Sequence, residues 1–357
     1  MTGERFQPQR VLLTGGAGFI GSNLARLLLE QGVQVLNVDY LSYAGNLATV
    51  KDLEAHPAYR FQRADISDRA AMQSAFDAFQ PDAVMHLAAE SHVDRSIDDP
   101  SPFVHSNILG TFTLLEVTRA WLAAGPERPF RFVHVSTDEV HGSLAPDEAA
   151  FNENTPYRPN SPYSASKAAS DHLARAWQQT YGLPLVITNC SNNYGPWQFP
   201  EKLIPLMITK ALAGETLPVY GRGENVRDWL YVGDHCDALW RVLTTAPPGG
   251  HYHIGGRTEL RNIDLVTMLC RLLDRLCPDS PHAPHEQLIE FVSDRPAHDL
   301  RYAVDTSRIE AELGWAPAVS FEQGLEQTLR WYLNNRDWCA AILADSYQGQ
   351  RLGTLST

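Results

Sequence analysis

The sequence lacks the features of a membrane-bound or exported protein. It has no run of about 18 apolar residues, and its polar N-terminus lacks the apolar segment of a signal peptide. The five cysteines are scattered and form no CxxC pair, so neither a disulfide framework nor a thiolate metal site is expected. These absences predict a reduced, cytoplasmic, globular protein without a metal.

Positive charge is also scarce. The formal net charge of −13 argues against a broad attraction to nucleic acid or to an anionic membrane. An anionic ligand therefore needs its own local Arg or Lys. A hydrophobic content of 44% over 357 residues is enough for one large core or for two domains that share a cleft.

The first half of the chain alternates short apolar runs with longer amphipathic ones. Strands are predicted at 10–14, 33–38, 59–63, 83–87, 130–135 and 185–188. Helices are predicted at 20–30, 69–79, 103–123 and 162–181. This alternation predicts an α/β fold, a Rossmann-type doubly wound parallel sheet with helices on both faces.

Past Asn192 the connections become rich in Pro and Gly, which indicates a smaller α/β domain in the C-terminal part. Segments 229–241 and 251–255 have strand or helix character that can return to the first sheet. We therefore predict a cofactor domain from 1–193 plus about 230–256, and a substrate domain from about 194–229 and 257–345. Residues 346–357 are expected to form a loose tail.

A glycine-rich loop links the first strand to the first helix. Its sequence, GGAGFIG at 15–21, satisfies both GxGxxG and GxxGxxG. Glycines there permit the tight turn and the close approach of a pyrophosphate to the helix N-terminus. Asp39, at the end of the next strand, can accept hydrogen bonds from ribose hydroxyls and would repel a 2′-phosphate, which favours NAD over NADP.

Two later strand ends are further candidates for the cofactor site. Asp65 and Ile66 can hold the adenine edge, and residues 86–89 (HLAA) can line the nicotinamide half. Taken singly, each of these segments fits equally well with ordinary residues at the end of a strand.

Tyr163 and Lys167 lie on one face of a predicted helix that begins at Ser161 and Pro162. Beside a nicotinamide, the ammonium is expected to lower the pKa of the phenol from its usual value near 10, so that a tyrosinate takes the proton of a substrate hydroxyl. The YxxxK pattern is common by chance. It predicts catalysis here because a dinucleotide loop precedes it.

Thr137, Asp138 and Glu139 follow an apolar strand, at the end of a parallel sheet where ligands bind. Thr137 can hydrogen-bond the hydroxyl that is oxidised. The two carboxylates have two interpretations: they cap the following segment, or they serve as the acid and the base of an elimination. Position alone does not decide between them.

These motifs resemble those of the extended short-chain dehydrogenases/reductases, and among them the dTDP-glucose 4,6-dehydratases, from Val11 to about Trp331. The resemblance rests on GGAGFIGS (15–22), DYLSYAGN (39–46), HLAAESHVDRSI (86–97), VSTDEVHG (135–142), SPYSASKAASD (161–171), CSNNYGPWQFPEKLIPL (190–206), GENVRDWLYVGDH (223–235) and DRPAHDLRY (294–302). Two positions depart from the family pattern, Ser42 in place of Thr and Ala297 in place of Gly.

The resemblance implies a redox-neutral loss of water from a dTDP-sugar, with NAD as cofactor. Tyr163, aided by Lys167 and Thr137, would deprotonate the 4-hydroxyl while hydride leaves C4. Glu139 would remove the C5 proton and Asp138 would protonate the departing 6-hydroxyl, after which hydride returns to C6. A homodimer formed through a pair of helices is also implied.

The resemblance further implies two sets of contact residues. The NAD contacts are Gly15, Gly18, Phe19, Ile20, Gly21, Asp39, Tyr40, Leu41, Ser42, Asp65, Ile66, Leu87, Ala88, Ala89, Ser106, Tyr163, Lys167 and Asn193. The substrate contacts are Ser91, Thr137, Asn192, Lys202, Leu203, Pro218, Tyr220, Arg227, Asn262, Asp294, Arg295 and His298, with Arg227 and Arg295 on the diphosphate.

Other functions compete with this one. A 4-epimerase of the same fold shares Tyr163 and Lys167 but does not require Asp138 and Glu139, whereas a UDP- or CDP-sugar dehydratase differs only in its nucleotide. A non-catalytic NAD-binding scaffold does not account for the intact set of reactive residues. A zinc hydrolase is not favoured, since no HExxH or similar spacing occurs.

Overall fold

The structure, a computed structural model, describes residues 5–125, 128–294 and 298–346. Seven strands form one sheet in the order β10-β6-β5-β4-β1-β2-β3. Their bounds are β1 Arg10–Thr14, β2 Gln34–Asp39, β3 Tyr59–Arg63, β4 Ala83–His86, β5 Arg131–Thr137, β6 Leu185–Cys190 and β10 His251–Ile254. Every neighbouring pair is parallel. The Rossmann-type fold class is confirmed, and the strand order reverses between β1 and β4, where such sheets bind ligands.

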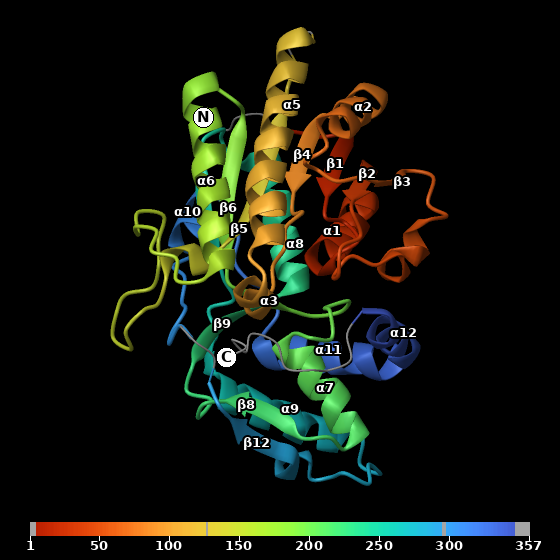
Figure 1. Cartoon of the computed structure of the whole chain (residues 1–357), viewed down its shortest axis with the longest axis vertical. Coiled ribbons are helices and arrows are strands. Elements are labelled where there is room, and N and C mark those ends of the chain that lie inside the picture. The colour runs from red at the N-terminus through yellow and green to blue at the C-terminus, as the bar shows by residue number, and fades with distance from the viewer. Residues whose placement is uncertain (1–4, 126–127, 295–297, 347–357) are drawn as a thin grey trace.

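Successive residues of β1 point to opposite faces of this sheet. Val11 and Leu13 belong to a core with α1 Phe19–Glu30, α8 Val232–Thr245 and α10 Ser307–Leu313. Leu12 belongs to a second core with α2 Arg69–Phe79, α5 Thr111–Ala124 and α6 Pro162–Tyr181. Figure 1 shows α5 and α6 in front of the sheet and α8 behind α5. The sheet is therefore covered on both faces, as the alternation predicts.

A second part of the chain has its own core. Its three-stranded sheet has the order β11-β9-β7, and β12 pairs with β8. The strands are β7 Asn192–Tyr194, β8 Leu217–Tyr220, β9 Val226–Tyr231, β11 Glu259–Arg261 and β12 Ile289–Val292. The helices are α7 Leu203–Ala213, α9 Asn262–Leu276, α11 Phe321–Asn334 and α12 Arg336–Ser346. Figure 1 shows α7, α9, α11, α12, β8 and β12 together in its lower part.

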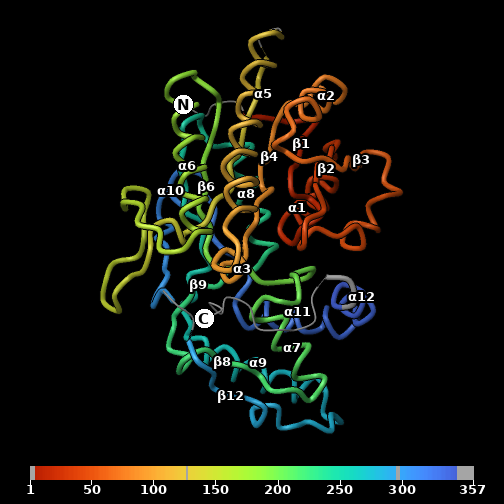
Figure 2. The backbone as a smooth tube through the Cα atoms, viewed as in Figure 1, coloured from red at the N-terminus to blue at the C-terminus, as the bar shows by residue number. Residues whose placement is uncertain are grey.

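Segment 229–241 returns to the first sheet only in part. Residues of β9 are paired with β7 on one side and β11 on the other, so this strand cannot join the larger sheet. The helix that follows, α8, packs against the first core, and β10 pairs with β6 at the edge of the sheet. Figure 2 shows the chain passing from the lower part back to the upper one at α8 and α10.

The helix predicted at 103–123 is divided. It consists of α4 Ser101–Phe103, a π-helical stretch Val104–Gly110 and α5. The wider turn carries Asn107, which bonds both main-chain groups of Glu90, accepting at 2.8 Å and donating at 2.9 Å. Such π-bulges are frequent beside functional sites.

The remaining elements are short. They are α3 Val93–Asp98 and the 3-10 turns Leu47–Thr49, Lys51–Leu53, Asp138–His141 and His285–Leu288. Among the helices that the structure describes, none is long and apolar enough to cross a membrane.

Candidate active site

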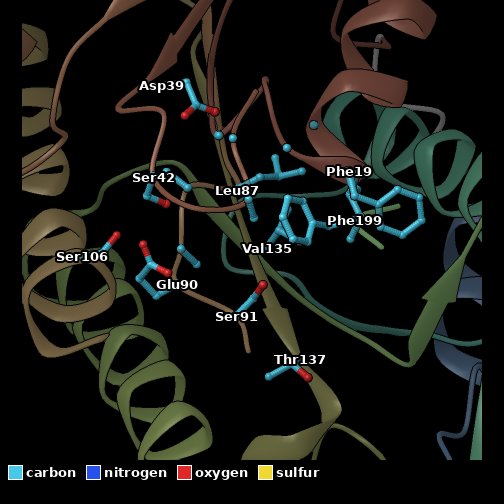
Figure 3. Close-up of a pocket in the computed structure, with 18 of the residues that line it drawn as sticks. Phe19, Asp39, Ser42, Leu87, Glu90, Ser91, Ser106, Val135, Thr137 and Phe199 are labelled. Atoms are coloured by element: carbon cyan, nitrogen blue, oxygen red, sulfur yellow. The ribbon is translucent and has the colours of Figure 1, made fainter. Parts of the chain in front are cut away.

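A cavity of about 390 Å³ opens at the carboxyl ends of the sheet strands and is lined by the glycine-rich loop (Figure 3). Gly15 has φ +74° and a Cβ there would lie 2.7 Å from the main-chain nitrogen of Ala88. A Cβ on Gly21 would lie 2.2 Å from the carbonyl oxygen of Gly15. At Gly18, in contrast, a Cβ would meet only ordinary van der Waals contact, at 3.4 Å. The fold therefore needs glycine at positions 15 and 21, while Gly18 leaves space that a ligand can fill.

The N-terminus of α1 faces this space. Its N-cap, Gly18, provides no side-chain hydrogen bond, and the first turn has no acidic residue. The first main-chain N–H groups of a helix have no partner within the helix, and the helix dipole favours negative charge there. The loop therefore fits the pyrophosphate of a dinucleotide.

Asp39 is fixed at the end of β2. Its Oδ2 accepts a hydrogen bond from the main-chain N–H of Ala17 at 2.9 Å, and its Oδ1 accepts one from Leu41 at 2.8 Å. Burial raises the pKa of Asp39, and these two bonds oppose the shift. The carboxylate is thus held at the cavity in the position predicted for a ribose partner.

The cavity brings together nearly all the residues predicted to contact NAD. Only Leu41 among them does not line it, since its part is the N–H that holds Asp39. His86, predicted at the nicotinamide half, does not line it either. Its ring is 1% exposed and is bonded by the hydroxyls of Thr14 at 2.8 Å and Thr111 at 2.9 Å, so it belongs to the core.

The start of α6 positions Tyr163 and Lys167. Ser161 caps the helix in a capping box with Ser164, and Pro162 is in the first turn, which confirms the predicted start. The ammonium of Lys167 donates to the main-chain carbonyl of Val135 at 2.9 Å. Both reactive side chains are buried and line the cavity.

The expected lowering of the pKa of Tyr163 is wrong for this structure. Burial raises the pKa of Tyr163 well above its ordinary value, and the negative charge of Glu139 raises it further. A hydrogen bond with Thr137 opposes the shift. Burial also lowers the pKa of Lys167. In this geometry the phenol keeps its proton.

The triplet Thr137-Asp138-Glu139 forms the junction between β5 and a 3-10 turn. The hydroxyl of Thr137 accepts the N–H of Glu139 at 3.3 Å, so the capping role falls to Thr137 and not to the carboxylates. Thr137 and Glu139 line the cavity with Tyr163. Figure 3 shows Thr137 at the end of the pocket opposite Asp39.

Asp138 is 1% exposed and is not among the residues that line the cavity; its Oδ1 accepts a hydrogen bond from the hydroxyl of Thr137, which does line it, at 3.3 Å. Its Oδ2 has no hydrogen-bond partner among the described residues. Burial raises the pKa of Asp138 well above its ordinary value, and Glu139 and Asp228 add to the shift. This shift favours the protonated carboxyl group, which is the form that a general acid requires.

A buried carboxylate ties these catalytic segments together. Asp171, on α6, accepts hydrogen bonds from Ser136 at 2.8 Å and Asn189 at 3.2 Å, and lies 2.9 Å from Nε2 of His134. Asn189 also donates to the carbonyl oxygen of Thr137 at 2.9 Å. Burial raises the pKa of Asp171, but the interactions with His134 and Ser136 outweigh it, so that its pKa is lowered. The network fixes α6 against the ends of β5 and β6.

The predicted substrate residues fall into two groups. Four of them line the cavity, namely Ser91, Thr137, Asn192 and Lys202. The ammonium of Lys202 donates to the carbonyl of Ser91 at 3.1 Å, and the side-chain oxygen of Asn192 is buried without a hydrogen-bond partner among the described residues.

The other substrate residues lie on the second part of the chain, outside this cavity. They are Leu203 on α7, Pro218 and Tyr220 on β8, Arg227 on β9, Asn262 at the start of α9, and Asp294 and His298 beyond β12. Arg295 lies outside the described residues. The guanidinium of Arg227 donates to the carbonyl of Asp299 at 2.9 Å and lies 4.2 Å above the ring of Tyr302.

Sequence reasoning missed several residues that line the cavity, among them Tyr43, Glu90, Cys190, Phe199 and Glu201. They lie within segments that carry the resemblance. The available signal was their place in those segments, but only the tertiary structure shows which members of each segment face the cavity.

Three comparisons with known proteins all find similarity to sugar-nucleotide 4,6-dehydratases. The sequence profile of the GDP-mannose 4,6 dehydratase family matches residues 12–328. A probable dTDP-glucose 4,6-dehydratase of Sinorhizobium fredii is 57% identical over 97% of this chain and 99% of its own length. A dTDP-glucose 4,6-dehydratase of Escherichia coli is 55% identical over 96% of this chain and 99% of its own.

A solved structure is also similar. DesIV, a dTDP-glucose 4,6-dehydratase of Streptomyces venezuelae with NAD and dTDP bound, is 47% identical and superimposes with a TM-score of 0.84. The match covers 93% of this chain and 99% of DesIV. The resemblance drawn from the motifs is confirmed. The chain belongs to the GDP-mannose 4,6 dehydratase family.

Proposed function

We propose that the chain is an NAD-dependent hydro-lyase that converts dTDP-glucose to dTDP-4-keto-6-deoxyglucose and water. The observation that carries this proposal is the buried Asp138 beside Glu139, at the same strand end as the cavity that contains Tyr163, with its pKa raised by burial. An alcohol oxidation followed by an elimination needs these three groups together.

The residues divide the work among the steps. Tyr163, oriented by Thr137 and fixed on α6 one turn from Lys167, takes the proton of the 4-hydroxyl. The glycine-rich loop and Asp39 would hold NAD, which would supply the hydride acceptor for C4 and the hydride donor for C6. Glu139 removes the C5 proton, which the 4-ketone has made acidic, and Asp138 protonates the departing 6-hydroxyl. Glu139 then returns a proton to C5, so that one water is lost and no net oxidation occurs.

The raised pKa of Tyr163 defines what this site must do. A phenol that keeps its proton becomes a base only when positive charge is brought near it. The positively charged nicotinamide ring would supply such a charge, and Lys167 lies on the same helical face. The role of Lys167 is therefore proposed as support for the tyrosinate and for the orientation of the cofactor.

We assign the two ligands, NAD and the sugar nucleotide, to the two parts of the chain. Residues 1–193 with about 230–256 would hold NAD, and about 194–229 with 257–345 would hold the sugar nucleotide. Arg227 and Arg295 are proposed on the diphosphate because a guanidinium matches its geometry. The remaining predicted contacts on the second part would then surround the nucleoside.

A homodimer is part of the proposal. Large apolar side chains are exposed along the front helices, at 54% for Val104, 45% for Leu109, 39% for Phe112 and 52% for Tyr181. Pairing of α5 and α6 with those of a second copy would cover them. Sedimentation at micromolar concentration tests this, since a monomer would contradict it. The location proposed for the enzyme is the cytoplasm.

The test of function is mass spectrometry of dTDP-glucose, deuterated at C4, incubated with the protein and no added reductant. Loss of one water with deuterium recovered at C6 is expected. An unchanged mass with inverted configuration at C4 would identify a 4-epimerase instead. Faster turnover of UDP-glucose or CDP-glucose would show that the nucleotide has been assigned wrongly.

A further inference from the structure

Residues 196–202, which we call the crossing segment, connect β7 to α7 and lie against the first part of the chain. The carbonyl of Pro196 accepts a hydrogen bond from Asn23 on α1 at 3.0 Å. The guanidinium of Arg26, also on α1, lies 4.5 Å from the ring of Trp197. The other end of the segment is tied by Lys202, which donates to the carbonyl of Ser91.

Between these two ends, side chains from three distant segments form a clasp. Arg95 on α3 lies 4.1 Å above the ring of Tyr43, and its Nε donates to Oε2 of Glu201 at 3.1 Å. The edge of Tyr43 meets Phe199, with ring centroids 5.8 Å apart and planes at 82°. The clasp is defined as Tyr43, Arg95, Phe199 and Glu201. It joins the loop after β2 to the crossing segment through the guanidinium of Arg95 and through the ring contact between Tyr43 and Phe199.

The setting makes this clasp stronger than a surface contact. The side chain of Glu201 is fully buried, and that of Arg95 is 27% exposed. Cation–π contacts and charge-assisted hydrogen bonds gain strength as water is excluded from them. Removing Arg95 takes away the guanidinium hydrogen bond of the buried Glu201 and leaves Lys202 and His92 as the basic side chains beside it.

The clasp forms part of the wall of the cofactor cavity. Tyr43, Phe199 and Glu201 line the same cavity as Gly18 and Asp39. Figure 3 shows Phe199 next to Phe19, with Ser42 and Glu90 on the other side of the pocket. A dinucleotide that reaches from Asp39 to Thr137 therefore passes beside the clasp and beside Phe199 and Lys202 of the crossing segment, which line the same cavity.

The proposed reaction gives this closure a purpose, and the inference rests on that proposed function. Hydride taken from C4 has to be returned to C6 in the same turnover. If the reduced cofactor dissociated early, the 4-keto sugar could not be reduced at C6 and the reaction would not be completed. We propose that the Tyr43–Arg95–Glu201 clasp holds the crossing segment closed over the cofactor and so retains NAD throughout the catalytic cycle. Tyr43, Arg95 and Glu201 are thus positioning residues for cofactor retention.

The experiment measures NAD loss without any sugar nucleotide. Purified holoenzyme is mixed with an excess of isotopically labelled NAD, and exchange of bound for labelled cofactor is followed by mass spectrometry. Arg95→Ala and Tyr43→Ala are each expected to raise the dissociation rate constant about tenfold, which corresponds to about 1.4 kcal/mol. Tyr43→Phe keeps the ring face but loses the hydroxyl that interacts with Glu201 and Ser91, so its effect is expected to be smaller than that of Tyr43→Ala.

A double mutant separates a shared contact from two independent ones. Because Arg95 and Tyr43 act on each other, the Arg95→Ala/Tyr43→Ala protein is expected to lose NAD no more than about threefold faster than either single variant. Multiplied effects of about a hundredfold would show independent roles and would overturn the clasp. If Arg95→Ala does not fold, Arg95→Lys keeps the charge but loses the flat guanidinium, and is expected to lose NAD faster than the parent.

The chain offers a matched control of the same construction. Arg308 pairs with Glu312 at 3.0 Å and lies 5.3 Å above the ring of Tyr252, and none of these residues lines the cavity. Arg308→Ala is expected to leave NAD exchange unchanged. Exchange at the parent rate in Arg95→Ala and Tyr43→Ala, or equal acceleration in Arg308→Ala, would refute the inference.

The outcome is separable from that of the proposed function. Dehydration of dTDP-glucose by the parent, with unaltered NAD exchange in the variants, would refute the role of the clasp but not the dehydratase function. If the variants exchange NAD faster but the parent does not convert dTDP-glucose, the dehydratase function is refuted and the role of the clasp is not. Thermal unfolding of each variant, followed by circular dichroism, identifies any that lose NAD through loss of the fold.

Discussion

Replacement of Asp138 by Asn is the most direct test of the two-step chemistry. Asp138 is 1% exposed and the pKa of its carboxyl is raised by burial, which favours the protonated form, and Asn cannot donate that proton. Loss of a general acid typically costs about 10²- to 10⁴-fold in rate, or about 3–5 kcal/mol in the barrier of the elimination. Oxidation of C4 does not use this proton. Asn also retains an oxygen that can accept from Thr137, as Oδ1 now does at 3.3 Å.

We therefore expect Asp138→Asn to uncouple the two steps. In a single turnover monitored by NADH absorbance, oxidation proceeds at nearly the parent rate, and enzyme-bound NADH accumulates instead of disappearing. Release of dTDP-4-keto-6-deoxyglucose, measured by mass spectrometry, falls by two to four orders of magnitude. Normal turnover, or an equal loss of oxidation and elimination, would refute the acid role of Asp138.

The parent enzyme offers a pH test of the same assignment. An acid works in its protonated form, so elimination is expected to weaken as pH rises through the raised pKa of Asp138. The single-turnover oxidation step should not share that descending limb. If both steps declined together with rising pH, another group would be responsible.

Four further substitutions test other parts of the site. Asp228→Asn removes a charge that raises the pKa of the general acid, so the descending limb of the elimination profile should move to lower pH; an unmoved limb would contradict this. Gly18→Ala should fold normally, as thermal unfolding would show, but bind NAD at least about tenfold more weakly in a titration, because its methyl group would occupy open space in the cavity. Gly21→Ala should instead destabilise the fold by about 1–3 kcal/mol, since its Cβ would overlap a carbonyl oxygen; the reverse pattern would refute both assignments. Asp171→Ala leaves several buried donors unsatisfied and should cost about 3–5 kcal/mol in urea unfolding. Because the folded pKa of Asp171 is lowered, its contribution is present above the ordinary value of 3.8 and is lost as pH falls through the folded pKa, so the parent should lose more stability in acid than the variant.

Local sequence patterns predicted most of the first sheet. The bounds of β1, β3, α2 and α6 agree with the predicted ranges, because hydrophobic periodicity and capping residues act over a few neighbouring positions. The division of the helix predicted at 103–123 was missed. Its π-helical turn depends on contacts of Asn107 with the main chain of Glu90, which periodicity does not contain.

The sequence also identified the reactive residues but not their environment. Tyr163, Lys167 and Thr137 could be found from motif and spacing. The direction of the pKa shift of Tyr163 could not, because burial and the proximity of Glu139 oppose the effect expected from the lysine. For the same reason the sequence left the roles of Asp138 and Glu139 open.

By itself, then, the sequence determined the α/β class, the dinucleotide loop and the candidate chemistry, since each depends on residues close together in the chain. Tertiary structure alone decided that Asp138 is buried, that His86 belongs to the core, and that Tyr43, Arg95 and Glu201 meet beside the cofactor cavity. Burial and long-range contacts are properties of how the segments pack. No local pattern encodes the distance between side chains that come from different segments.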